Sequence, residues 1–540
     1  MTSRLFSRPC CAPLSSRTRY DMSSLSPCGM SGATGRLFNT IKILLLTIGI
    51  SSCGASSSGE PAPTEAVMLD VVGNSIPAWS AGVEDGIPSY ARKVTVTDFG
   101  AIANDGRDDT AAFEAAIAEA AGQGAVVIPE GQFHLSRSLT LPSETVLRGS
   151  GPATELLIYH ADDAFVVLGS GSGNEEASAE SGYINVTSGA TRGSMQVEVS
   201  NADGFSVGDG IELVQGFDAE LHLTQATWDV SWGKRLIGHF TEVLAINGNR
   251  LTLADPVRID MDANLGIWAA PVRYTEYSGF ENFRVERQSD NDGHIFSIKY
   301  ASNIWLDGIE SDNADRCHVA AGQGRRLEIR NSSFQNATDY GGGGHGYGVD
   351  LSSRQTGSLI IHNRFNHLRH ALVLHLGANG NVVAYNHSSD AYQDSGANWL
   401  PDDFTLHGHY AFSNLIESNH LEGVSISDYW GPTGPDNVFL RNYLTRDPVA
   451  AYDHSENQIL ISNQLPDPGM ELDTTIDPAS WSLVGNSHTL EGMPTNATYA
   501  DQIPDSLFFD SAPDFYGDLP WPSLGADIDA EQAFVPAESL

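Results

Sequence analysis

The chain has 540 residues, of which 41% are hydrophobic, and its formal net charge is −39. This hydrophobic content is sufficient for a folded core and excludes disorder for most of the chain. A protein so acidic repels phosphate backbones, which excludes general nucleic-acid binding. The 54 glycines and 25 prolines favour many turns over long helices.

The first strongly apolar segment, residues 43–50, follows a basic stretch and is too short to span a bilayer. It is typical of a secretory signal. Small residues and then Cys53 follow it, and this arrangement resembles a bacterial lipobox. The resemblance implies cleavage before Cys53, lipidation of its sulfur and, because Gly54 follows rather than Asp, the outer membrane or cell surface. The alternatives are an uncleaved signal or a simple secretory peptide, and Met30 is an alternative start.

The cysteine count and the composition give two further expectations, one on disulfides and one on domain boundaries. If Cys53 carries lipid, Cys317 is the single cysteine of the mature chain, which excludes a disulfide framework. The membrane is then contacted only through the lipid anchor. We expect, in chain order, a removed leader at 1–52, a tether and N-terminal arm at 53–90, a cap with the first coils at 91–186, a small β insertion at 187–262, the main coils at 263–490 and a tail at 491–540.

A short pattern recurs seven times: two or three strand-like residues and then Asn. Most intervals are close to 23 residues. Three short strands and three turns need about 22 to 25 residues to return to the same face. Asn tolerates the left-handed backbone of a tight corner, and its amide can bond to the next coil as a ladder. The pattern predicts an all-β fold, a right-handed parallel β-helix, over a sandwich rich in Asn. The residues are Asn331, Asn363, Asn386, Asn419, Asn442, Asn463 and Asn486.

Two segments interrupt the repeat. Apolar residues at helical spacing from Phe113 to Ala120 predict an amphipathic helix that covers the open end of the first coil. Alternating residues and the Asn247-Gly248 turn predict a small antiparallel β insertion between early coils.

The region 94–151 carries Asp98-Phe99-Gly100-Ala101, Asp105-Gly106, Ile128-Pro129-Glu130-Gly131 and Leu147-Arg148-Gly149-Ser150-Gly151. It closely resembles the opening of the pectate-lyase-like β-helix superfamily. The resemblance implies the fold and a carbohydrate-active enzyme. It implies less about the reaction, because that superfamily includes lyases, hydrolases, epimerases and phage depolymerases.

Positive charge and histidine gather between residues 316 and 375, beside a Gly-rich loop at 341–348. In so acidic a chain, this predicts a cationic strip that binds an acidic polysaccharide, either uronate-containing or sulfated. The alternative is that these arginines pair with carboxylates outside the segment. They are Arg316, Arg325, Arg326, Arg330, Arg354, Arg364 and Arg369.

Three functions fit these residues. The favoured one is β-elimination by a polysaccharide lyase, in which Arg369 neutralises a uronate, His370 or His345 is the base and His407 is the acid. The second is a glycoside hydrolase with Asp403 and Asp428 as its carboxylates. The third is a surface glycan-binding scaffold without catalysis, against which the clustered histidines argue.

The remaining expectations concern binding. Substrate contacts are expected from residues in the loops and strands around the same coils: Tyr347, Arg354, His375, His409, Tyr429 and Trp430. No cofactor and no metal ligands are assigned, although Asp390, Asp394, Asp402 and Asp403 have the oxygen ligands that Ca²⁺ prefers. We expect a monomer.

Overall fold

The computed structural model describes residues 78–172, 177–218, 234–289, 292–394, 401–427, 431–488 and 503–540. The chain divides into two compact units, Met1–Glu60 and Pro61–Leu540, and every described residue belongs to the second. The expected signal and the lipidation of Cys53 therefore lie outside the described residues. Within these residues, no helix combines the length and apolar character that crossing a membrane requires.

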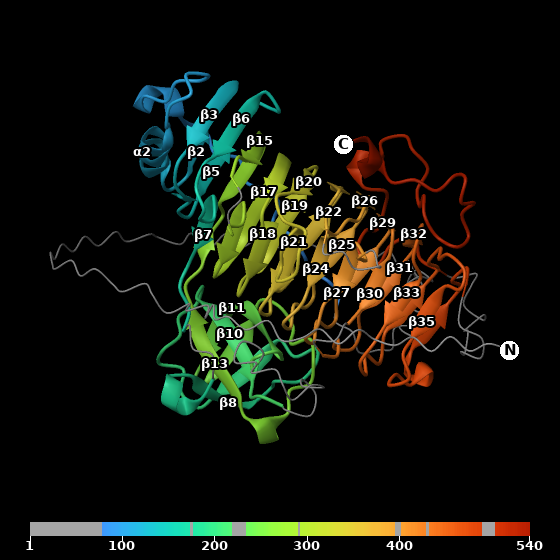
Figure 1. Ribbon diagram of the computed structural model, residues 1–540. Coiled ribbons are helices and arrows are strands. Elements are labelled where there is room, and N and C mark those ends of the chain that lie inside the picture. Colours follow the sequence, from blue (N-terminus) through green and yellow to red (C-terminus); the bar gives the residue numbers. More distant parts are fainter. Residues whose placement is uncertain are drawn as a thin grey trace, which may run out of the picture. The chain divides into compact units, whose positions relative to one another are not determined.

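Parallel strands stack into a solenoid with three walls (Figure 1). The first wall is a ten-stranded sheet, and each further coil adds one strand to it in register. Leu372, for example, pairs with Val349 of the preceding coil and with Phe404 of the following coil. The strands of the first wall are β4 (Leu139–Thr140), β7 (Phe165–Leu168), β16 (Phe296–Lys299), β18 (Cys317–Gly322), β21 (Tyr347–Ser352), β24 (His370–Leu374), β27 (Phe404–Leu406), β30 (Val424–Ile426), β33 (Val449–Ala451) and β35 (Met470–Leu472).

The other two walls belong to one twenty-stranded sheet, which turns a corner within each coil. Its early strands are β1 (Arg92–Thr95), β2 (Gly124–Val127), β3 (Gly131–Leu135), β5 (Thr145–Arg148), β6 (Thr154–Ile158), β14 (Thr275–Glu276), β15 (Gly279–Arg287) and β17 (Ala301–Ala314). The second wall continues through β19 (Arg325–Arg330), β22 (Leu359–Ile361), β25 (Val382–Ala384), β28 (Leu415–Glu417), β31 (Val438–Leu440), β34 (Ile459–Ile461) and β36 (Ser482–Val484). The third wall continues through β20 (Ser333–Ala337), β23 (Arg364–Asn366), β26 (His387–Ser389), β29 (His420–Leu421) and β32 (Tyr443–Leu444).

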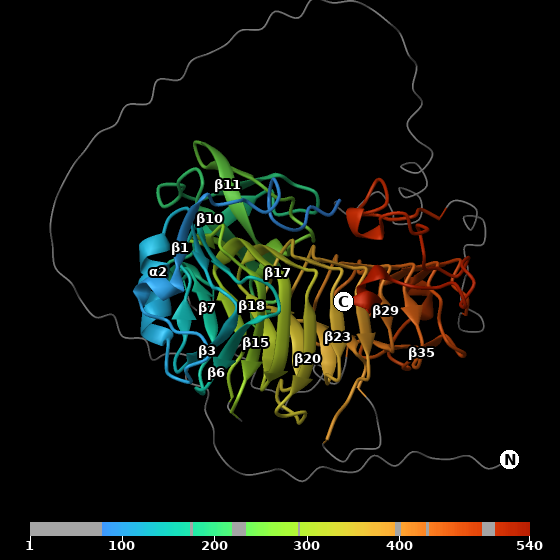
Figure 2. The same ribbon diagram turned by 90° about the horizontal axis from the view of Figure 1, so that it is seen from above.

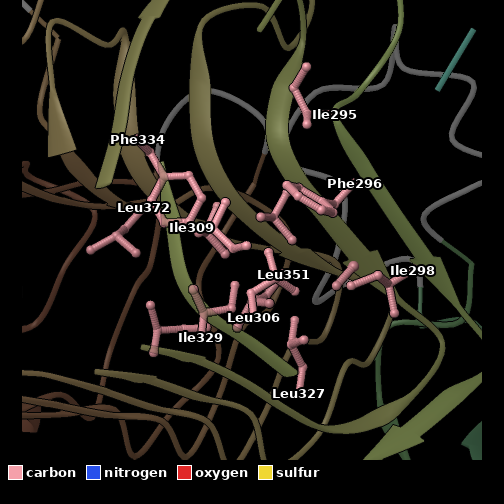
Figure 3. Packing of buried hydrophobic residues seen from close by; sticks show 14 of the residues in the cluster. Ile295, Phe296, Ile298, Leu306, Ile309, Leu327, Ile329, Phe334, Leu351 and Leu372 are labelled. Carbon is pink, nitrogen blue, oxygen red and sulfur yellow. The ribbon is translucent and has the colours of Figure 1, made fainter. Parts of the chain in front are cut away.

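Apolar side chains from all three walls fill the solenoid as one continuous core (Figure 3). No coil can bury its own apolar face, so the core depends on stacking. Helix α2 (Thr110–Ala120) covers the open end of the first coils, as the sequence predicts, because Phe113, Ala116 and Ile117 face the core. This observation, together with the two parallel sheets, confirms the predicted β-helix with its capping helix.

A ladder of buried amides joins successive coils between the second and third walls. The Nδ2 of Asn419, for example, donates to the Oδ1 of Asn442 at 3.0 Å, while its own Oδ1 accepts from the Nδ2 of Asn386 at 3.0 Å. The ladder runs through six of the seven predicted asparagines: Asn363, Asn386, Asn419, Asn442, Asn463 and Asn486.

The prediction is wrong for Asn331, which lies one residue early. Ser332 occupies the ladder position and donates its backbone N–H to Asn363 Oδ1 at 3.1 Å. The prediction is also wrong about the left-handed corner, which falls on the residue before each ladder position. Asn331 has φ 51°, and Tyr385 and Ser418, which precede ladder asparagines, have φ 55° and 53°.

A second ladder, which the sequence analysis missed, lies between the first and second walls. It joins Asn381, Asn414, Asn437 and Gln458 through side-chain hydrogen bonds of 2.9 to 3.1 Å.

A closed antiparallel barrel confirms the predicted β insertion. It consists of β8 (Ile184–Ser188), β9 (Gln196–Val199), β10 (Gly210–Gln215), β11 (Gly238–Asn247), β12 (Arg250–Leu253) and β13 (Ile267–Val272). The Nη2 of Arg325 lies 2.8 Å from Asp255 Oδ2, and Arg326 Nη2 lies 3.2 Å from Asp255 Oδ1. Burial raises the pKa of Asp255, but the two guanidinium groups outweigh it and lower the pKa to about 2. Buried ion pairs thus fix the barrel to the solenoid.

We predict that Asn419→Ala destabilises the fold by about 3 kcal/mol, because it leaves buried donors and acceptors of two neighbouring coils unpaired. Chemical denaturation monitored by circular dichroism measures this change. The matched control is Asn366→Ala on the third wall, a half-buried amide bonded to Ser389, for which we expect a loss below about 1 kcal/mol. Equal losses for the two variants would contradict a special role of the ladder.

Candidate functional site

The site that the sequence indicates lies on the outer face of the first wall, where β21, β24 and β27 run side by side. Tyr347 and His370 are register partners, and their rings lie 5.1 Å apart. The guanidinium of Arg369 lies over the Tyr347 ring at 5.6 Å, and its Nη1 donates to the Gly341 carbonyl at 2.8 Å. The ring of His407 lies 6.5 Å from that of His370. Three predicted catalytic residues, Arg369, His370 and His407, therefore share one wall.

His370 is held as a neutral imidazole. Its Nδ1 donates to the Asp402 carbonyl at 2.6 Å, which leaves Nε2 as the acceptor. Burial and the charge of Arg369 lower the pKa of His370 to about 3. Such a group accepts hydrogen bonds but is a poor proton base near neutral pH. The geometry thus suits His370 to binding more than to the predicted role as base.

A second group on the same face centres on Asp350, which follows Val349 on β21 and points outward. The Oδ1 of Asp350 lies 2.8 Å from Nε2 of His375, and the His375 and His407 rings lie 5.8 Å apart. Burial raises the pKa of Asp350, but His375, His294 and His407 outweigh burial and hold it below its usual value. Asp350 is therefore a carboxylate that stabilises positive charge on the imidazoles around it.

Asp402, two coils away and just before β27, provides the opposite case. It is half-buried, and burial together with the charges of Asp403 and Asp447 raises its pKa to about 7, with an opposing effect from Arg446 and a hydrogen bond with Ser425. Two carboxyl groups on one wall thus have pKa values displaced in opposite directions, which is typical of acid and base pairs in active sites. The strand register separates Asp350 from Asp402 by two strands and three residues, or about 14 Å between their Cα atoms.

His345 lies in the Gly-rich loop, and its partners are Asp292 and Asp315 from preceding coils and Asp339 just before the loop. Its Nδ1 is 2.9 Å from Asp315 Oδ1 and 3.5 Å from Asp339 Oδ2, and its Nε2 is 3.6 Å from Asp292 Oδ1. Asp292, Asp315 and His345 have ligand atoms close enough to hold a metal ion. Asp292 also pairs with Arg316 at 3.0 Å, so these contacts are satisfied as ion pairs and hydrogen bonds.

Four predicted site residues are buried and not accessible on the outer face of the first wall. Arg354 is buried, with Nη2 at 2.7 Å from Glu212 Oε1 of the barrel, so it is unavailable to substrate. Asp403 is 1% exposed and accepts the N–H groups of Glu422 and Gly423, each at 2.9 Å. It lies just before β27, and its burial on these amides removes it from the predicted hydrolase pair. His409 is 1% exposed, and Tyr347 is 5% exposed beneath Arg369.

The predicted cationic strip is wrong, because its arginines serve as structural ties. Arg325, Arg326 and Arg354 bind the barrel, and Arg330 pairs with Asp307 at 3.1 Å. Arg364 donates to the Leu540 carbonyl at 3.0 Å. These partners lie outside residues 316–375, as the alternative interpretation holds. Of the seven, Arg316 and Arg369 lie at the edge of the first wall, where they donate to carbonyls of the Gly-rich loop at 2.8 Å.

The remaining predictions have separate outcomes. Asp428, Tyr429 and Trp430 lie outside the described residues. The four acids named for Ca²⁺ are occupied or apart, since Asp403 binds backbone amides and Asp390 lies 2.7 Å from His367 Nδ1. A pocket of about 630 Å³ lies beside α2 and β4, lined by residues such as Ile117 and Thr140, away from the histidines of the first wall.

The sequence analysis missed Asp350 and gave Asp402 only a metal role. The signal for Asp350 was present, because it stands between Val349 and Leu351 on a strand with alternating inward and outward residues.

Comparison with known proteins agrees with this architecture. A family model described as Rhamnogalacturonase A/epimerase, pectate lyase-like, matches residues 93–222. Among 88 matching solved chains is the tailspike protein gp49 from Pseudomonas phage LKA1, with a TM-score of 0.51, 16% identity, and coverage of 69% of this chain and 64% of that chain. Another is the Gp54 tailspike of Acinetobacter baumannii bacteriophage AP22, solved with an A. baumannii capsular saccharide, with a TM-score of 0.50, 12% identity, and coverage of 71% and 66%.

The chain spans slightly less than two thirds of these two tailspikes. At such identities the likeness shows the fold alone, a parallel β-helix. No curated protein matches the chain.

We predict that Arg354→Ala destabilises the protein by about 3 kcal/mol, because it removes one of the two arginines that pair with the buried Glu212. Chemical denaturation measures the loss. Arg250→Ala is the matched control on the barrel: this exposed side chain pairs with Glu198 at 3.4 Å, and its removal changes stability by less than about 1 kcal/mol. A variant at Arg354 with unchanged stability would contradict the assigned structural role.

Proposed function

We propose that the chain is an extracellular enzyme that depolymerises a polysaccharide lying along the outer face of the first wall. The observation that carries the proposal is the group of His407, His375 and Asp350 on that face, within 5.8 Å from ring to ring and 2.8 Å from imidazole to carboxylate. A wall that only binds sugars does not need titratable groups supporting one another. The rhamnogalacturonase-like family match and the tailspike fold support a glycan as the substrate class.

The favoured chemistry is β-elimination at a uronate. His407 accepts the proton α to the carboxylate, since the carboxylate of Asp350 stabilises the imidazolium that forms. His375, held against Asp350 at 2.8 Å, donates a proton to the leaving 4-linked oxygen. Arg369 neutralises the sugar carboxylate, and the neutral His370 beside it accepts a hydrogen bond from a sugar hydroxyl. The roles of base and acid thus shift from those that the sequence predicts.

Glycoside hydrolysis is the second candidate, and the raised pKa of Asp402 favours it. A half-buried carboxyl with a pKa of about 7 is protonated in part at neutral pH and can act as a general acid. Its partner carboxylate is not Asp403, because that group is buried on backbone amides.

A panel of polysaccharides tests the proposal: alginate, pectate, glycosaminoglycans, ulvan and carrageenans. Rising ultraviolet absorbance from unsaturated uronate indicates the lyase, and new reducing ends without that absorbance indicate the hydrolase. We expect the first result with a uronate-containing substrate. The absence of both products with every glycan of the panel would contradict a depolymerase acting on these glycans.

We predict that His407→Ala lowers the rate of product formation about 10²- to 10⁴-fold while the melting temperature changes little, because the side chain is a half-exposed proton-transfer group. His454→Ala, which removes an exposed imidazole from the turn after β33, is the matched control and retains full activity. Equal activity in the two variants would remove His407 from the mechanism.

Because His375 as the acid of a lyase also gives a fall in activity at high pH, the effect of Asp402→Asn on the pH profile separates the two chemistries. If Asp402 is the acid of a hydrolase, activity falls as the pH rises through about 7, because the carboxyl loses its proton, and Asp402→Asn abolishes that limb. If His407 is the base of a lyase, activity falls as the pH drops, because the base becomes protonated. We expect activity to fall as the pH drops, and we expect Asp402→Asn to have the same pH profile as the wild type.

A further inference from the structure

The C-terminal tail meets the third wall at a pair of histidines. His387 on β26 and His420 on β29 are register partners on neighbouring parallel strands, and their rings lie 4.9 Å apart. The short helix η8 (Pro536–Ser539) lies over them, and Glu538 Oε1 is 2.7 Å from His420 Nδ1. Figures 1 and 2 both show the C-terminal end beside β29.

One nitrogen in this group has no partner. The Nδ1 of His387 is buried and forms no hydrogen bond with any described residue. A buried polar atom without a partner costs about 1 to 3 kcal/mol, and such atoms are rare unless a ligand satisfies them.

The donor set matches a metal ion. One ligand atom from each of His387, His420 and Glu538 lies within 4.8 Å of the other two. Two imidazoles and one carboxylate suit zinc and similar ions, whereas Ca²⁺ and Mg²⁺ prefer all-oxygen sites. Ligands around tetrahedral zinc lie about 3.3 Å apart, so the 2.7 Å contact between His420 and Glu538 needs to open by only about 0.6 Å.

We propose that His387, His420 and Glu538 bind a divalent transition-metal ion, with zinc preferred, that ties the C-terminal tail to the third wall. Water fills the fourth position, as in other three-ligand zinc sites. Arg364 on the preceding coil also faces this group, and its Nη1 is held on the Leu540 carbonyl at 3.0 Å, which directs its charge into the tail. The inference concerns a different wall and does not depend on the proposed depolymerase activity.

The cluster of Asp292, Asp315 and His345 is a weaker candidate for a metal. Both nitrogens of His345 lie beside carboxylates, and Asp292 pairs with Arg316. No atom of these three side chains is buried without a partner in the described chain.

Calorimetric titration of the chelator-treated full chain with Zn²⁺ at pH 7 tests the proposal. We expect one ion to bind per chain, and Glu538→Gln and His420→Ala each to weaken binding at least tenfold. His454→Ala, an exposed histidine elsewhere, keeps the wild-type affinity. Absence of zinc binding, or unchanged affinity in both ligand variants, overturns the proposal.

Thermal unfolding gives a second readout that does not depend on catalysis. Saturating zinc raises the melting temperature of the wild type, because it binds only the folded tail, and the rise is absent in Glu538→Gln. This substitution changes a half-exposed side chain of the tail and leaves the solenoid intact. A zinc-dependent rise of equal size in that variant places the ion elsewhere and overturns the assignment.

Discussion

Parallel register between coils is the constraint on which the whole molecule depends. A buried asparagine amide must bond both the coil before it and the coil after it, and it can do so only when the coils are aligned residue by residue. A slip of one residue would leave a column of buried amides unpaired and turn the inward apolar side chains outward. The same alignment decides which side chains appear on the outer face, so it places His370, His375 and His407 there.

Much of this architecture could be predicted from the sequence, because its signals are local or periodic. The recurring Asn predicted the number of residues in one coil, and the amphipathic segment predicted the capping helix. The error at Asn331 arose because a serine holds the ladder position there, after a residue in the left-handed conformation. The second ladder was missed because it is shorter, with three asparagines and Gln458 at its end.

The site was harder to predict, because it depends on partners remote in the chain. The arginines between residues 316 and 375 formed a dense cluster of charge, yet Arg354 pairs with Glu212, which lies 142 positions away. Charged residues that cluster in the sequence therefore need not cluster on the surface of the protein. Neighbouring Asp402 and Asp403 differ through their partners: the buried Asp403 accepts two backbone N–H groups of the next coil, whereas Asp402 is half-buried.

The ladder also makes the coils interchangeable. Each rung presents the same amide to the coil on either side, and successive rungs are 21, 23 or 33 residues apart. A duplicated or deleted coil would therefore find matching hydrogen-bond partners at both of its new junctions. Solenoids joined in this way can lengthen or shorten by whole units during evolution, and the outer face of the first wall grows or shrinks with them.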